Sequence, residues 1–303
     1  MVARGKADRD EAAASPRLTS PDRVVYPRAG ITKREVADYY RAVADRVLAD
    51  VGGRPLSLLR CPGGVGGQCF FQKHHARALG GAVRAIPLRE KDGDEACYVA
   101  IDSAEGLLEL VQMNTLELHP WGSLGNDLER PDRLVFDLDP GTGVDWKAVT
   151  AAARDVRRRL ADMGLQGFAR LSGGKGVHVV VPIRPGPSWD EARGFCESLA
   201  DTMAQQRPDR YVATASKAKR DGVIFIDWLR NARGQTSVSS WSLRARESAG
   251  VAMPVRWEEL GRVGAGDAYD LRRALRRASA LRGEEWPGWQ DACDQALPDA
   301  TVD

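Results

Sequence analysis

Short apolar segments alternate with longer amphipathic ones between residues 134 and 227, and this alternation limits the folds open to the chain. Four apolar stretches have the length and the β-branched content of strands: 134–139, 168–171, 177–181 and 223–227. Two longer segments have apolar residues at helical spacing, 145–163 and 188–206, and the second opens with the capping box Ser188-Trp189-Asp190-Glu191. Strands and helices that interleave in this way pack as helices on a mostly buried sheet. The sequence therefore predicts an α/β (α+β) fold.

The N-terminal part of the chain has weaker patterns. The capping box Thr32-Lys33-Arg34-Glu35 opens a run of apolar residues at helical spacing, which predicts a helix over 33–50. Residues 56–59 and 70–71 are typical of short strands on either side of a glycine-rich turn, and 102–113 of a helix. Residues 1–17 mix charge with alanine without a sustained period, so we expect a flexible leader or linker there.

The composition excludes several classes of protein. The chain has 303 residues, of which 43% are hydrophobic and 28% charged, values typical of one large or two small globular domains. Its longest apolar runs, such as 177–183, fall far short of the roughly 20 residues that cross a bilayer, so no membrane partner is expected. The five cysteines are odd in number, scattered and without a C-x-x-C pair, which indicates reduced thiols in the cytosol and no zinc site.

Carboxylates stand at the ends of two predicted strands. Asp137 and Asp139 flank Leu138, so both point to one face of their strand. Asp227 closes the apolar run 223–227, where a lone carboxylate is costly without a partner. If the two strands pair, three carboxylates converge, and such oxygen ligands suit two Mg²⁺ or Mn²⁺ ions that drive phosphoryl transfer. The alternatives are solvated acids in a turn and a strand-end acid bonded to nearby backbone.

A glycine-rich loop, Ser172-Gly173-Gly174-Lys175-Gly176, joins two of the apolar strands. Its glycines allow backbone N–H groups to converge into an anion nest, to which Lys175 adds a charge and Ser172 a hydroxyl. His178 follows on the next strand between two valines. Because the loop lacks the Walker A pattern, a hairpin turn with a satisfied sheet histidine is the alternative to a triphosphate site.

These segments resemble the polymerase domain of bacterial ligase D, a member of the archaeo-eukaryotic primase superfamily that acts in non-homologous end joining. The matching stretches lie in order within residues 18–246 and read LTSPDRVVYP, GGQCFFQKH, IDSAEGLLELVQMNTLELHPW, RPDRLVFDLDPG, RLSGGKGVHVVVP, VIFIDWLRNARGQT and WSLRAR. The resemblance implies a primase-polymerase fold of two packed modules, the second with an RRM-like catalytic sheet. Its expected parts are an N-terminal module over 18–130, the catalytic module over 131–250 and a C-terminal helical segment over 251–303.

The resemblance also implies roles for individual residues. Two Mn²⁺ or Mg²⁺ ions are expected on the catalytic residues Asp137, Asp139 and Asp227. Nucleotide contacts are expected from His119, Ser172, Lys175, His178, Arg244 and Arg246. DNA contacts are expected from Arg23, Lys33, Phe70, Phe71, Lys73 and Arg220.

Within the DNA-binding set, the resemblance places Arg23 and Lys33 at the 5′-phosphate of a broken end and Arg220 near the primer terminus. It implies that Phe70 and Phe71 stack on the template. The family often has lysine where this chain has Arg23, a change that keeps phosphate binding but alters its geometry. Without the resemblance, the two phenylalanines are more typical of a core, and Arg244 with Arg246 of a solvated strand face.

The function implied by the resemblance is template-dependent nucleotide addition from NTP or dNTP, which fills gaps and extends ends during double-strand-break repair. The implied partners are DNA ends with a 5′-phosphate, gaps and overhangs, together with Ku and ligase or phosphoesterase domains. The implied location is the bacterial cytoplasm, in association with the nucleoid. Two alternatives remain, a DNA-end-binding module without catalysis and a haloacid-dehalogenase-like phosphotransferase. The latter needs D-x-D-x-T, whereas Thr142 stands one place too late after Asp137.

The near-neutral charge of the chain conceals a basic segment. Lys and Arg total 44 against 42 Asp and Glu, a net charge of +2. Residues 207–246 nevertheless hold nine basic and three acidic residues. Since the sum averages an acidic centre with a basic surface, it excludes only a uniformly basic protein, and salt-dependent binding to DNA is expected.

Overall fold

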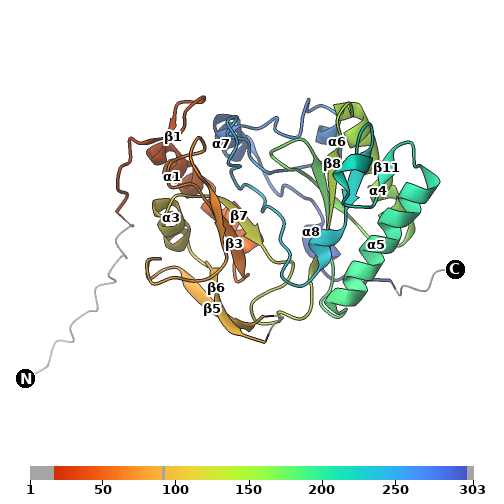
Figure 1. Ribbon diagram of the computed structural model, residues 1–303, viewed down its shortest axis with the longest axis horizontal. Coiled ribbons are helices and arrows are strands. Elements are labelled where there is room, and N and C mark those ends of the chain that lie inside the picture. The colour runs from red at the N-terminus through yellow and green to blue at the C-terminus, as the bar shows by residue number, and fades with distance from the viewer. Residues whose placement is uncertain (1–16, 91–92, 299–303) are drawn as a thin grey trace, which may run out of the picture.

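Two large β-sheets, one of six strands and one of five, form the centre of the described part of the chain. The computed structural model describes residues 17–90 and 93–298. In Figure 1 the N-terminal elements, coloured red to yellow, lie on one side, and the green to cyan elements of the second sheet lie on the other. Buried residues from both halves belong to a single hydrophobic cluster. The expected leader, residues 1–17, lies outside the described residues except for Arg17.

The second sheet contains the strands that the sequence predicted, in a βαββαβ order. These elements are β8 (Arg133–Pro140), α4 (Trp146–Asp162), β9 (Phe168–Leu171), β10 (Val177–Pro182), α5 (Trp189–Gln206) and β12 (Ile224–Asp227). The strands lie in the order β12-β8-β10-β9, which is the arrangement of an RRM sheet, and β11 (Tyr211–Val212) and β13 (Met253–Val255) extend its two edges. The expected mixed α+β fold with an RRM-like sheet is confirmed.

The two faces of this sheet differ in what they contact. The helices α4 and α5 pack on the face that carries Leu134, Phe136 and Leu138, all fully buried. Residues that stand directly opposite each other in antiparallel strands share a face. Asp137 stands opposite Asp227 on one side and His178 on the other, and His178 stands opposite Arg170. The other face therefore carries a row of four charged or titratable side chains.

The first sheet is built from the N-terminal segment. Its strands are β3 (Leu56–Arg60), β4 (Phe70–Gln72), β5 (Arg84–Arg89), β6 (Glu95–Ala100) and β7 (Thr115–Pro120), and β3 pairs with β7 as well as with β4 and β6. The helices α1 (Lys33–Ala42), α2 (Ala44–Val51) and α3 (Ala104–Gln112) and the short pair β1 (Val24–Tyr26) and β2 (Ile31–Thr32) accompany it. The β5–β6 hairpin and β7 were not predicted from the sequence.

The prediction of a single helix over 33–50 is wrong in one detail, because the helix is interrupted at one residue. The chain forms α1 and α2 instead, which meet at Val43, where φ is −114° and ψ is 14°. The N–H of Val43 still donates to the carbonyl of Tyr39, and its own carbonyl accepts from Val47. Because apolar spacing and hydrogen bonding both continue across Val43, the sequence pattern does not reveal this one-residue change of direction.

The C-terminal part returns to the second sheet and then to the first half. After the 3₁₀ turns η1 (Lys217–Lys219) and η2 (Leu229–Asn231), residues 236–243 run beside β7, and β13 pairs with β9. The helices α6 (Trp257–Leu260), α7 (Leu271–Ala280) and α8 (Trp289–Ala292) follow, and α7 packs against α1 (Figure 1). The module boundaries expected from the sequence stay predictions. No described helix is both long enough and apolar enough to cross a membrane.

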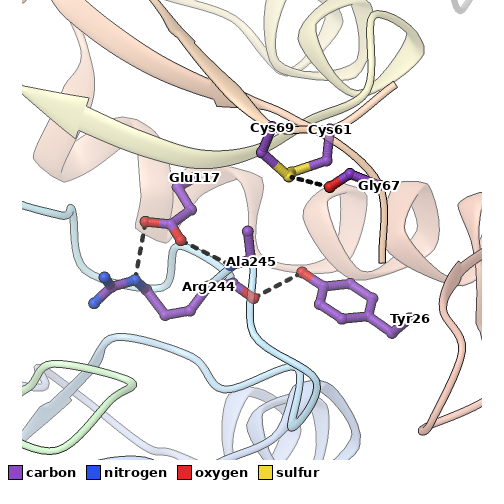
Figure 2. Close-up of a disulfide and its surroundings, with 7 residues drawn as sticks. All are labelled: Tyr26, Cys61, Gly67, Cys69, Glu117, Arg244 and Ala245. Atoms are coloured by element: carbon purple, nitrogen blue, oxygen red, sulfur yellow. Dashed lines mark hydrogen bonds and ion pairs between the residues drawn. A yellow bond between two sulfur atoms is a disulfide. The ribbon is translucent and has the colours of Figure 1, made fainter. Parts of the chain in front are cut away.

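The expectation that all cysteines are reduced is wrong for one pair. Cys61 and Cys69 form a disulfide (Figure 2). Arg60 and Phe70 pair across the β3–β4 hairpin, so the next residues on either side face each other with a Cα–Cα distance of 4.3 Å. The expectation relied on C-x-x-C spacing and missed a pair that a hairpin brings together. Cys97, Cys196 and Cys293 are free.

Candidate active site

The three predicted carboxylates lie side by side on adjacent strands. Asp137 and Asp139 project from β8 on the face opposite the helices, and Asp227 on β12 stands directly across from Asp137. Two arginines contact them. Arg230 lies 3.0 Å from an oxygen of Asp227 and 3.7 Å from one of Asp137, and Arg220 lies 3.1 Å from Asp139. The strand pairing on which the sequence argument depended is therefore present.

The protonation of these acids reflects how closely they are packed. Burial would raise the pKa of Asp137, but the His178 ring and the Arg230 guanidinium lower it to about 2. Burial raises the pKa of Asp139, and the charge of Asp137 raises it further. Burial also raises the pKa of Asp227, against the opposing effect of Arg230. A bound cation would relieve the repulsion between these half-buried negative charges.

The donor set fits hard divalent cations. Three carboxylates on one sheet face supply the oxygen ligands that Mg²⁺ and Mn²⁺ prefer. In the part of the chain that the structure describes, no group of three or more His, Cys, Asp or Glu side chains is closed into a metal site. The guanidinium groups of Arg220 and Arg230 contact the same oxygens instead. The chemistry of the ligands is suitable, and the two-ion site stays a prediction.

The glycine loop between β9 and β10 lies beside these acids. The N–H groups of Gly174 and Gly176 converge, but their shared acceptor is the hydroxyl of Ser172, at 3.2 and 3.1 Å. Gly173 has φ +66°, and its N–H donates to the carbonyl of Gly266 at 3.0 Å. The hydroxyl of Ser172 thus shapes the loop, and Lys175 is exposed at its tip. The loop can therefore attract an anion mainly through the positive charge at its tip, and less through free backbone N–H groups.

Arg244 links the glycine loop to the first sheet. Its Nη1 donates to the carbonyl of Ser172, and its Nε donates to Glu117 on β7 at 2.9 Å. Glu117 also accepts from the N–H of Ala245, and the hydroxyl of Tyr26 donates to the carbonyl of Arg244 at 3.0 Å (Figure 2). His119 lies two residues along β7, with Nε2 2.8 Å from Glu117. Parts of both sheets therefore meet around one arginine.

His178 is held by a buried network that the sequence did not indicate. Arg170 donates to its Nδ1 at 3.0 Å and to Asp50 on α2 at 3.3 Å. Asp50 also contacts Arg133 and accepts from the N–H of Ser240 at 2.6 Å. A guanidinium can only donate, so Nδ1 of His178 accepts and its ring proton is on Nε2. That nitrogen lies 3.4 Å from Asp137 and faces the carboxylate row.

The residues expected at the 5′-phosphate gather around the C-terminal end of α3. Lys33 is buried, and its Nζ donates to the carbonyl of Gln112 at 2.8 Å. Burial and the nearby charge of Arg23 lower the pKa of Lys33 to about 8. Arg23 donates to the carbonyl of Pro62 at 2.6 Å and to the side chain of Asn114. These two neighbouring cations form a compact basic site.

The remaining expected DNA contacts lie on different elements. Phe70 and Phe71 are 43% and 61% exposed, so neither is a core residue. Phe71 makes an edge contact with His119 at 5.5 Å between ring centres, which places it next to a residue expected at the nucleotide. Lys73 is half-exposed and paired with Glu90 at 2.9 Å. Arg220 lies with the carboxylates and over the ring of Phe225.

Comparisons with known proteins place the chain in a family. A family model described as the primase-polymerase domain of LigD matches residues 32–286. The chain belongs to this family. It is 38% identical over 281 residues to the multifunctional non-homologous end joining protein LigD of Pseudomonas aeruginosa, covering 92% of this chain and 33% of that protein. It is 35% identical over 246 residues to the LigD of Mycolicibacterium smegmatis, covering 80% of this chain and 32% of that protein.

A solved structure supports the same assignment. The polymerase domain of Mycobacterium tuberculosis ligase D, determined in complex with DNA, matches with a TM-score of 0.80 and 33% identity, over 87% of this chain and 94% of that one. The chain spans about a third of the length of the curated relatives it matches. Membership of the LigD primase-polymerase family implies a nucleotidyltransferase.

The structure groups the expected residues into two sites. One, between the sheets, gathers the three aspartates, the glycine loop, His119, His178, Arg220 and Arg244. The other, beside α3, holds Arg23 and Lys33. Arg246 is exposed next to Gly174, and Lys73 belongs to neither group. The residues that sequence reasoning missed are Asp50, Glu117, Arg170 and Arg230. Glu117, Arg170 and Arg230 stand in segments already singled out, next to His119, Ser172 and Asp227, whereas Asp50 had no such signal.

Proposed function

We propose that this domain is a DNA-directed nucleotidyltransferase that fills gaps and extends ends with NTP or dNTP during double-strand-break repair by non-homologous end joining. One observation carries the proposal: Asp137, Asp139 and Asp227 share a sheet face that adjoins the glycine loop and the buried His178. Membership of the LigD primase-polymerase family supports the same class of reaction. The DNA-bound structure of the M. tuberculosis domain supports DNA as the template.

Two Mn²⁺ or Mg²⁺ ions would be held by Asp137, Asp139 and Asp227, and when bound they supply activation of the primer 3′-hydroxyl and charge neutralisation at the leaving pyrophosphate. Lys175 and Arg246, both exposed beside the glycine loop, would neutralise the triphosphate from one side. The Nε2–H of His178 faces the same space and would donate a hydrogen bond without adding charge.

The DNA would approach along the first sheet. Phe71, exposed beside His119, would offer a stacking surface for a template base. Arg23 and Lys33 would bind the 5′-phosphate of the downstream strand, which replaces the backbone carbonyl contacts they make here. Ku and ligase or phosphoesterase domains, in cis or in trans, are the proposed partners in the bacterial cytoplasm, near the nucleoid.

A primer-extension assay tests the proposal. The wild-type chain is given a gapped duplex with a 5′-phosphate, NTP or dNTP, and Mn²⁺ or Mg²⁺, beside Asp137→Ala and the matched surface control Asp162→Ala. We expect templated extension by wild type and control and a loss of at least a hundredfold in Asp137→Ala, because an in-line displacement loses a metal ligand.

Each alternative gives a different result in the same assay. DNA binding without extension by wild type would favour an end-binding module. Release of phosphate from small phosphomonoesters without nucleotide incorporation would favour a phosphotransferase. Unchanged extension by Asp137→Ala would remove the metal assignment.

A further inference from the structure

A groove lined with arginines lies outside the two sites already described. It runs between the 262–269 segment and α7, and has a volume of about 640 Å³. Arg262, Arg273, Arg276 and Arg277 line it together with Tyr269 and small apolar side chains. None of its ten lining residues is acidic. The groove is open at the surface, so a ligand can enter without any movement of the chain.

The charge in this arginine groove is only partly balanced. Arg277 is held by Glu259 through hydrogen bonds of 2.6 and 2.8 Å, and Arg273 lies 3.9 Å from Asp270. The side chains of Arg262 and Arg276 have no ion-pair or hydrogen-bond partner among the described residues. Guanidinium groups gathered in one concavity repel each other, which favours an anion that bridges them.

The walls of the arginine groove narrow the choice of anion. The Arg277 guanidinium lies 5.4 Å from the centre of the Tyr269 ring, and apolar side chains complete the surface. Arginines beside an aromatic ring suit a ligand with phosphates and flat bases. A volume in the range of small-ligand sites accommodates a short stretch of single strand and not a duplex.

The arginine groove is joined to the glycine loop through its own wall. The carbonyl of Gly266 accepts from the N–H of Gly173 at 3.0 Å. A methyl group added at Gly266 would stand 2.6 Å from the carbonyl oxygen of Gly176, so the segment is seated directly on the loop. One face of the segment therefore supports the candidate nucleotide loop while its side chains line the groove.

We propose that the arginine groove binds the phosphate backbone of single-stranded nucleic acid outside the polymerase centre. The choice of ligand rests on the proposed function, whereas the site itself rests on its charge and shape. A strand bound in the groove would raise the affinity of the protein for long overhangs. It would not contact the reacting atoms of the polymerase centre.

The test compares the full chain with Arg273→Gln/Arg276→Gln. The control is Arg158→Gln/Arg207→Gln, which removes two exposed arginines that are already paired with acids elsewhere. Binding of a labelled oligo-dT is followed by fluorescence anisotropy between about 50 and 200 mM salt. We expect the groove variant to bind roughly tenfold more weakly, with a salt slope reduced by about 1.4, since each single-strand phosphate contact adds about 0.7. The control should match wild type.

Two further measurements distinguish weaker binding in the arginine groove from a loss of folding or of catalysis. All four altered arginines are at least partly exposed, so thermal unfolding should be unchanged, and Arg273→Lys/Arg276→Lys should restore most of the affinity. Oligonucleotides carrying 5-iododeoxyuridine should crosslink to Tyr269, also in Asp137→Ala. Equal binding by the groove and control variants overturns the proposal, as does stronger competition by polyglutamate than by oligo-dT, which would indicate an acidic protein partner. Extension activity on short primers tests the polymerase proposal alone.

Discussion

Replacement of Arg170 tests the buried network that orients His178. The side chain is 1% exposed, and burial lowers the pKa of its guanidinium to about 10, which still leaves it charged at neutral pH. It donates to His178, Asp50 and Ser237 at 3.0 to 3.3 Å. Arg170→Met keeps most of the volume and removes all three hydrogen bonds.

The expected cost can be worked from these contacts. Removal of one partner from a buried ion pair costs about 3–5 kcal/mol. Asp50 keeps Arg133 and the N–H of Ser240, so we expect the lower end, about 3 kcal/mol, in the free energy of unfolding measured with urea. The double variant Asp50→Asn/Arg170→Met should lose less than the sum of the single variants, with a coupling of about 1–3 kcal/mol.

Replacement of Arg170 should also change the tautomer of His178. Without a donor at Nδ1, only the Asp137 carboxylate, 3.4 Å from Nε2, still favours the proton on Nε2, so part of the rings can carry it on Nδ1. Nitrogen chemical shifts of the His178 ring should show one Nε2–H tautomer in wild type and a mixture in Arg170→Met, and nucleotide addition should fall under conditions where the variant is folded. Arg170→Lys keeps the charge but reaches fewer acceptors, so it should lie between the two. A loss below about 1 kcal/mol with an unchanged tautomer would refute the reasoning.

Three further outcomes follow from other parts of the molecule. Cys69→Ser opens a nine-residue ring and should lower the free energy of unfolding by about 2.5 kcal/mol in oxidising buffer but not under reducing conditions. Burial would raise the pKa of Glu117, but His119 and Arg244 lower it to about 2, so its contribution of about 3 kcal/mol is present above pH 4.5 and lost as the pH falls toward 2. Urea unfolding of Glu117→Gln should show a weaker acid dependence over that range. Phe71→Ala, at an exposed position, should weaken single-strand binding by about 1–3 kcal/mol with little change in thermal unfolding.

The sequence predicted the second sheet and the positions of its acids because both depend on local pattern. Strand alternation alone places Asp137 and Asp139 on one face, and the apolar run before Asp227 marks a strand end. The first sheet was mostly missed. In its β5–β6 hairpin, Pro87 interrupts β5 and the burial pattern of β6 does not alternate, so neither strand has a clear strand pattern. In β7 polar and apolar residues do alternate from Thr115 to His119, so a strand pattern was present there and was overlooked. The two strands and the turn next to Cys61 and Cys69 were predicted, but their pairing and register were not, so the disulfide was missed.

The partners of the site residues could not be predicted because they come from elements that only the tertiary fold brings together. Asp50 on α2 reaches Arg170 on β9 across 120 positions of the chain, and Glu117 reaches Arg244 across 127. Each acid of the centre has a basic neighbour here, so the net charge of the chain does not show which charges stay unpaired. Among the described residues, positive charge without an acidic partner is found at Lys175 on the tip of the glycine loop and at Arg262 and Arg276 in the arginine groove, where it is available to a polyanion.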